Sequence, residues 1–213
     1  MSEEKSKKKY YDYVSVGNRT SQKASFVQNH DKNRMFEELL KTFENKRVLV
    51  LVKSKRTADE LLKYLSEKEI VALCAHGNHR ASTIEEVASA FNDKEATIFI
   101  TTDRILEKLS LTDIEVLVNY DLPLQGPDYF MRLRLVDEIG ESISFVDPED
   151  ESMLALIEHM MKCEMDELTL ENFEHSKGVA VQTKDKRKKP RHKKVEQRAK
   201  RKAEIKSKWV PSK

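Results

Sequence analysis

The sequence predicts an α/β fold in which one open, mostly parallel sheet carries helices on both of its faces. Short aliphatic segments alternate with amphipathic segments between residues 25 and 173. The clearest aliphatic segment, residues 47–52, has no polar residue after its first arginine, which is typical of a parallel strand buried on both faces. The chain of 213 residues is long enough for one such domain with tails, because domains usually span about 100 to 200 residues.

Each expected element follows from the spacing of apolar residues. Strands are expected at short aliphatic runs, in residues 25–28 as an edge strand, and in 47–52, 70–74, 96–101, 114–118 and 142–146. Helices are expected where apolar residues recur every three or four positions, in residues 31–43, 55–66, 82–91 and 149–161, with a short helix or turn over 103–109. Because strands and helices alternate, right-handed crossovers are expected to join parallel strands.

The distribution of charge divides the chain into an acidic body and a basic tail. The net charge is +2, but residues 177–213 hold sixteen lysines and arginines against three acids, which leaves a charge of −11 on residues 1–176. We expect a flexible N-terminal arm over residues 1–24, a folded domain over 25–173 and a basic tail over 174–213. Basic arms of this kind are typical of proteins that bind nucleic acid.

The residue types exclude several classes of site. The five glycines are too far apart for a phosphate-binding loop or a G-x-S-x-G nucleophile elbow. Cys74 and Cys163 are too few for a disulfide framework or a multi-cysteine zinc site. His30, His76 and His79 lack a metal-binding spacing, so no metal site is expected.

The N-terminus, the length of the aliphatic runs and the few cysteines indicate the compartment. The N-terminus lacks the apolar segment of a secretory signal, and the longest aliphatic run is far shorter than the roughly 18 residues of a membrane-spanning helix. We expect a soluble, cytoplasmic protein with reduced cysteines and no membrane partner.

Six short motifs follow one another along the body. They are VLVLVKSK at 48–55, AHGN at 75–78, TTD at 101–103, VNYDLP at 118–123, YFMR at 129–132 and ISFV at 143–146. In this order and spacing they resemble the motifs of the C-terminal RecA-like domain of DEAD-box RNA helicases. The resemblance covers roughly residues 25–173 and implies a single RecA-like domain.

The positions that serve ATP hydrolysis and RNA grip in that family are changed here. The family's R-G-x-D falls on residues 107–110, which read EKLS, and its Q-x-x-R falls on Ala81 and Ile84. Without gaps, the two arginines expected at the γ-phosphate fall on Leu135 and Glu138, and the alternative is that Arg134 is shifted inward by a deletion. Such an arginine accelerates phosphoryl transfer by about 10³- to 10⁵-fold where measured. The 213 residues also contain neither a P-loop nor a D-E-A-D box. The chain alone is therefore expected to have no catalytic residues and no cofactor, and to use ATP only if a separate first RecA-like domain completes the site.

The resemblance also implies positions that contact RNA or a partner. In the family, the peptide at the H-G glycine and the threonine of the T-T-D motif face the RNA backbone, and these positions are Gly77 and Thr102 here. The alternative is that Gly77 only makes a turn and that Thr102 only caps a short helix. Arg132 keeps the place of an arginine that the family ties to contact between its two domains.

The basic tail is the stronger candidate for RNA binding. Its cations would release counterions from bound phosphates, which makes the affinity fall steeply with salt. The candidate RNA-binding residues of the tail are Lys186, Arg187, Lys188, Lys189, Arg191, Lys193, Lys194, Arg198, Lys200, Arg201 and Lys202. The alternative is a solubilising arm without a defined target.

We therefore expect an RNA-binding accessory protein built on a degenerate helicase domain, without ATPase or unwinding activity of its own. Its partner would be RNA or a ribonucleoprotein, bound through the basic tail. One alternative is the C-terminal half of a split ATP-dependent RNA helicase whose first domain is a separate chain. Another is a protein-interaction module that docks on a helicase or ribonucleoprotein through its acidic face and Arg132.

Overall fold

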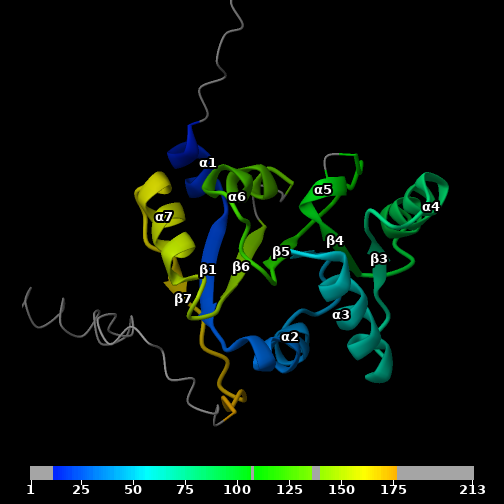
Figure 1. Ribbon diagram of the computed structural model, residues 1–213, viewed down its shortest axis with the longest axis horizontal. Coiled ribbons are helices and arrows are strands. Elements are labelled where there is room, and N and C mark those ends of the chain that lie inside the picture. Colours follow the sequence, from blue (N-terminus) through cyan, green and yellow to red (C-terminus); the bar gives the residue numbers. More distant parts are fainter. Residues whose placement is uncertain (1–11, 107, 136–139, 177–213) are drawn as a thin grey trace, which may run out of the picture. The chain divides into compact units, whose positions relative to one another are not determined.

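The computed structural model describes residues 12–106, 108–135 and 140–176, which lie in one compact unit that ends at Ser176. Seven parallel strands form one sheet in the order β3-β4-β2-β5-β6-β1-β7 (Figure 1). The strands are β1 Ser21–Phe26, β2 Val48–Val52, β3 Leu73–Ala75, β4 Ile98–Thr102, β5 Val116–Asn119, β6 Glu141–Val146 and β7 Asp166–Glu167. The predicted α/β fold with an open parallel sheet is confirmed.

Helices cover both faces of this sheet, as predicted (Figure 1). After a short 3-10 turn, Asn29–Asp31, two helices pack on one face: α2 Lys32–Leu40 and α3 Lys55–Glu67. The opposite face carries α1 Tyr13–Arg19, α4 Ala81–Asn92, α5 Asp103–Leu106, α6 Gly126–Leu133 and α7 Glu151–Met161. Each face therefore has its own apolar core.

Strand β2 shows why the aliphatic sequence folds this way. It lies between β4 and β5, and all five of its residues are buried. Leu49 and Leu51 contribute to one core, whereas Val48, Val50 and Val52 contribute to the other. Burying such a side chain contributes about 1.5 to 3 kcal/mol relative to leaving it in water, so an all-aliphatic strand is most stable at this central position.

The N-terminal boundary of the predicted domain is wrong. Residues 13–19 form α1 and β1 begins at Ser21, so both elements lie within the segment expected to be a flexible arm. Gly17 of α1 comes so close to α7 that a Cβ on it would stand 3.0 Å from the Cβ of Met161. Strand β1 is not an edge strand either, because it pairs with β6 on one side and β7 on the other. The free energy of this packing, rather than local spacing, orders the segment.

The C-terminal boundary lies slightly beyond residue 173. Phe173 is buried, and Ser176 donates hydrogen bonds to the Asp31 carboxylate from its backbone nitrogen at 2.8 Å and its hydroxyl at 2.5 Å. The tail residues predicted to bind RNA, 186–202, lie outside the described residues. Within the described part of the chain, no helix is long and apolar enough to span a bilayer.

Candidate nucleic-acid interface

Three neighbouring strands end at the same edge of the sheet, and the loops after them carry the predicted RNA-contact positions. Strands β3, β4 and β2 are adjacent and parallel, so their carboxyl ends meet there. In open α/β sheets, ligands bind outside the carboxyl ends of the strands. We call the loop residues at this edge the rim: Lys55, Gly77, Asn78, Arg80, Thr102 and Arg104.

Gly77 is exposed in the turn after β3, and the fold does not require glycine there. It does not have a positive φ, and a Cβ added to it would meet only the Cδ of Arg104, at 4.0 Å. Another residue would make the same turn without strain. The glycine therefore leaves open backbone that a ligand can approach closely.

Thr102 is the last residue of β4, which lies beside β3 in the sheet. Thr101 donates a hydrogen bond from its hydroxyl to the Ala75 carbonyl at 2.8 Å, which holds the ends of β3 and β4 together. Thr102 itself is only 8% exposed. It therefore presents less surface to a ligand than Gly77 does.

Cationic side chains lie near Gly77. Lys55 begins α3, and its Nζ donates a hydrogen bond to Asn78 Oδ1 at 2.8 Å. Arg80 and Arg104 are exposed and make no ion pair with any residue that the structure describes. The motifs include Lys55 without a role and leave out Arg104, although a basic residue just after a parallel strand is a signal that the sequence contains.

The turn after β3 also contains a cluster that the sequence did not predict. Asp59, His76 and His79 bring three potential metal ligands within 4.8 Å of one another, although no metal site was expected. His76 is buried, and its Nε2 lies 2.8 Å from Asp59 Oδ1. Burial and the nearby His76 lower the pKa of His79. Asp59 comes from α3, seventeen residues before His76, so the spacing of the histidines alone does not reveal this cluster.

Arg132 does not face a partner, contrary to the prediction. The side chain is completely buried, and its Nε and Nη2 donate to the two Asp103 carboxylate oxygens at 2.7 and 2.6 Å. Its Nη1 donates to Asn119 Oδ1 at 2.9 Å and to the Asp121 carbonyl at 2.8 Å. All three guanidinium nitrogens are thus used inside the domain, where they fasten α6 to the ends of β4 and β5.

A second charge network closes the same edge over the loops that follow β2, β5 and β6. Lys32 Nζ lies 2.9 Å from Asp121 Oδ1 and 3.4 Å from Asp147 Oδ2. Lys53 Nζ donates to Asp150 Oδ1 at 2.8 Å. Burial lowers the pKa of Lys53, but Asp150 and the neighbouring carboxylates raise it by more, so it lies above its usual value. The charged side chains in this part of the edge pair with one another. The side chains and backbone of the rim therefore remain more accessible to a ligand.

The positions at which the family places its ATP-site groups hold other residue types here. Leu135 stands where an arginine was expected, and it is half-buried against the core. In the segment after β4, Leu109 is buried and Ser110 is exposed. Glu107 and Glu138 lie outside the described residues.

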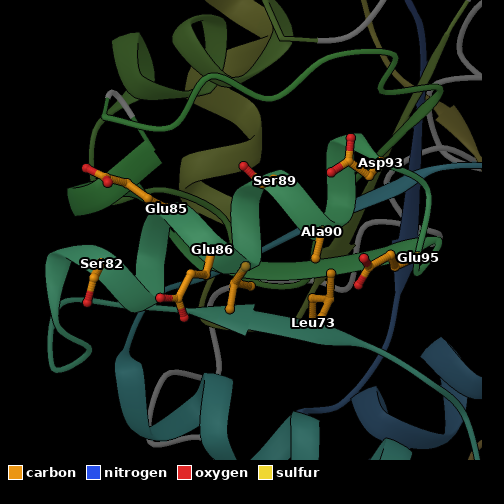
Figure 2. Close-up of a pocket in the computed structure, with 9 residues that line it drawn as sticks. Leu73, Ser82, Glu85, Glu86, Ser89, Ala90, Asp93 and Glu95 are labelled. Atoms are coloured by element: carbon orange, nitrogen blue, oxygen red, sulfur yellow. The ribbon is translucent and has the colours of Figure 1, made fainter.

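An acidic groove lies beside α4. Its volume is about 670 Å³, and it runs between α4 and the edge strand β3. Figure 2 shows its acidic side chains along α4 and the segment that follows, together with the β3 residue Leu73. The acids are Glu85, Glu86, Asp93 and Glu95. This charge repels phosphate, so the groove is unsuited to nucleic acid.

Comparisons with known proteins agree with this architecture. Residues 31–137 match the family described as helicase conserved C-terminal domain. The ATP-dependent RNA helicase SUB2-2 of Vanderwaltozyma polyspora is 31% identical over 154 residues, which cover 70% of this chain and 35% of that protein. The chain thus spans about a third of the length of this curated relative.

Solved structures show the same fold. A DEAD box protein from the hyperthermophile Methanococcus jannaschii superimposes with a TM-score of 0.67 at 27% identity, covering 72% of this chain and 43% of that one. The S. cerevisiae protein Dbp5, solved bound to RNA and ADP BeF3, has a TM-score of 0.66 at 22% identity and covers 70% of this chain and 41% of its own.

Proposed function

The chain belongs to the family of helicase conserved C-terminal domains, as found in DEAD-box RNA helicases, and we propose that it acts as an RNA-binding accessory protein without ATPase activity of its own. In this proposal the rim contacts the sugar-phosphate backbone. The basic tail adds attraction that does not depend on RNA sequence. Support from a relative comes from Dbp5, which was solved with RNA bound.

The observation that carries the proposal is the open backbone at Gly77 between cationic side chains. A phosphate oxygen accepts hydrogen bonds from backbone N–H groups and from lysine and arginine. Helix α4 begins just beyond this turn, and no side chain caps its first N–H groups. The first turn of α4 also contains no acid, so no carboxylate of that turn competes with a phosphate for its donors.

The proposal of no ATPase activity rests on the missing guanidinium groups. Catalysis of phosphoryl transfer depends on positioning and on stabilising charge at the γ-phosphate. Leu135 offers neither, and Arg132 is committed to Asp103. Mixing the chain with a first RecA-like domain would therefore give no RNA-stimulated ATP hydrolysis, whereas activity in the mixture would favour a split helicase instead.

The first test compares RNA binding by the whole chain and by a chain that ends at Gln182, using fluorescence anisotropy over a salt series. Each phosphate contact to a single strand contributes about −0.7 to the slope of log K against log salt. If the tail dominates, truncation abolishes most binding and flattens the slope. If neither chain binds RNA, the proposed function is wrong.

A second test isolates the rim. The variant Lys55→Gln with Arg104→Gln removes two rim charges, and its slope is expected to be shallower by about 1.4 than that of the wild type. The matched control, Arg56→Gln with Lys63→Gln, removes two exposed charges of α3 that pair with Glu60 and Glu67 on the same helix. If the slope becomes shallower by the same amount in both double variants, the rim has no special role in RNA binding.

The acidic groove favours a second candidate, a protein-interaction module. An extended basic segment of a partner would add to the free edge of β3, and its lysines or arginines would meet the carboxylates of α4. Binding of a lysine-rich peptide that is lost in Glu86→Gln with Glu95→Gln, but not in Glu149→Gln with Glu151→Gln, would support this candidate. If both double variants bind the lysine-rich peptide equally well, the groove is not its binding site.

A further inference from the structure

The cluster of Asp59, His76 and His79 has the composition of a transition-metal site. Asp59 comes from the second turn of α3, and the two histidines come from the turn that follows β3. One ligand atom from each residue lies within 4.8 Å of the others. Two imidazoles and a carboxylate are a ligand set that binds Zn²⁺, whereas Mg²⁺ and Ca²⁺ prefer oxygen ligands.

His76 is held rigidly at the centre of this cluster. It is 2% exposed, its Nε2 lies 2.8 Å from Asp59 Oδ1, and its Nδ1 accepts a 3.4 Å hydrogen bond from the backbone nitrogen of Asn78. Its ring also packs against the ring of His79, with the two centroids 4.0 Å apart. A buried, oriented imidazole loses little conformational freedom when it becomes a ligand.

The unpaired ring nitrogen of His79 is a second observation that points to a bound cation. Its Nδ1 is buried and has no hydrogen-bond partner among the residues that the structure describes. Leaving a buried polar atom unpaired is costly, so such atoms in folded proteins usually have a partner. The pair formed by His76 and Asp59 does not explain this nitrogen, whereas a bound cation gives the cluster the missing partner.

Asp59, the third residue of the cluster, leaves it open to solvent. The Asp59 side chain is 60% exposed, so an ion can enter from that side and keep a water molecule in its fourth coordination position. We propose that Asp59, His76 and His79 bind one Zn²⁺ ion, which links α3 to the turn after β3. Binding through Nε2 of His76 places the ring proton on Nδ1, so the weak hydrogen bond from Asn78 is given up.

The test is a Zn²⁺ titration of the full chain by calorimetry, with a chelator of known affinity as competitor. Asp59→Asn and His79→Gln are expected to weaken the affinity at least tenfold, because losing even a residue that only supports a ligand typically costs 10- to 100-fold. His159→Gln is the matched control, since His159 is exposed on α7 outside the cluster. Its affinity is expected to equal that of the wild type.

A spectroscopic measurement on the unaltered chain keeps the test independent of the variants. Co²⁺ in place of Zn²⁺ is expected to give the visible absorption of a four-coordinate site, and excess Mg²⁺ is expected not to displace it. Absence of this spectrum overturns the proposal. Unchanged Zn²⁺ affinity in Asp59→Asn and His79→Gln, or equal weakening in His159→Gln, also overturns it, because the ion then binds elsewhere on the chain.

Discussion

Replacing Arg132 with methionine is expected to lower the free energy of unfolding by roughly 3 to 5 kcal/mol, the usual cost of breaking a buried ion pair from one side. The methionine occupies much of the same volume, so the loss comes mainly from the four hydrogen bonds of the guanidinium group. A domain is stable by only about 5 to 15 kcal/mol, so this single contact is a large part of the total.

The magnitude follows from what each acceptor does after the substitution. Asn119 Oδ1 and the Asp121 carbonyl both lose the Arg132 Nη1 donor, and a buried acceptor left unpaired costs about 1 to 3 kcal/mol. Asp103 contributes less, because its side chain is 39% exposed and water can replace the guanidinium group. Two unpaired acceptors and a partly rehydrated carboxylate together account for the expected loss.

Urea unfolding followed by far-UV circular dichroism measures this loss. Arg132→Lys is expected to fall between the wild type and Arg132→Met, because lysine keeps the charge but not the two-pronged contact with Asp103. Arg56→Met is the control, since Arg56 is exposed and its ion pair is with Glu60 on the same helix, and no measurable change is expected. A loss below about 1 kcal/mol for Arg132→Met, the size of an exposed ion pair, would refute the reasoning.

Three further predictions concern other sites. Gly77→Ala is expected to leave the free energy of unfolding unchanged or raised by up to about 1 kcal/mol, because the Cβ meets only Arg104 Cδ at 4.0 Å, but to weaken RNA binding in the anisotropy assay. Unchanged RNA affinity would argue against close approach at this turn. Cys74 is buried, and burial raises its pKa to about 12, so iodoacetamide at pH 8 is expected to modify the exposed Cys163 first. Faster labelling of Cys74, identified by mass spectrometry, would contradict its burial. Burial raises the pKa of Glu141, but hydrogen bonds from two lysines lower it by more, so its net pKa lies below the usual 4.5 and its stabilising contribution is lost as the pH falls below that value. Urea unfolding between pH 3 and 7 is expected to show a weaker loss of stability in acid for Glu141→Gln, and an identical loss would refute this assignment.

Local sequence was sufficient for the elements whose apolar residues are both dense and regular. The five buried residues of β2 and the apolar stripe of α3 identify a central strand and its crossover helix, because burial on two faces or on one face leaves different periodicities. Helix α1 escaped prediction because seven residues span only about two turns, which is too short for a reliable period. Its order depends on contact with α7, which is distant in sequence.

In the candidate sites too, the sequence placed some residues and the packing of helices on the sheet placed others. The motifs placed Gly77 and Thr102 at the ends of adjacent strands, since consecutive parallel strands bring the loops at their carboxyl ends together. The inward direction of Arg132 depends on how α6 is rotated against the sheet, and the motif does not specify that rotation. The approach of Asp59 to His76 depends on how α3 packs beside the end of β3. Hydrophobic spacing therefore determines which segments become strands and helices, whereas the packing of those segments decides which polar side chains meet.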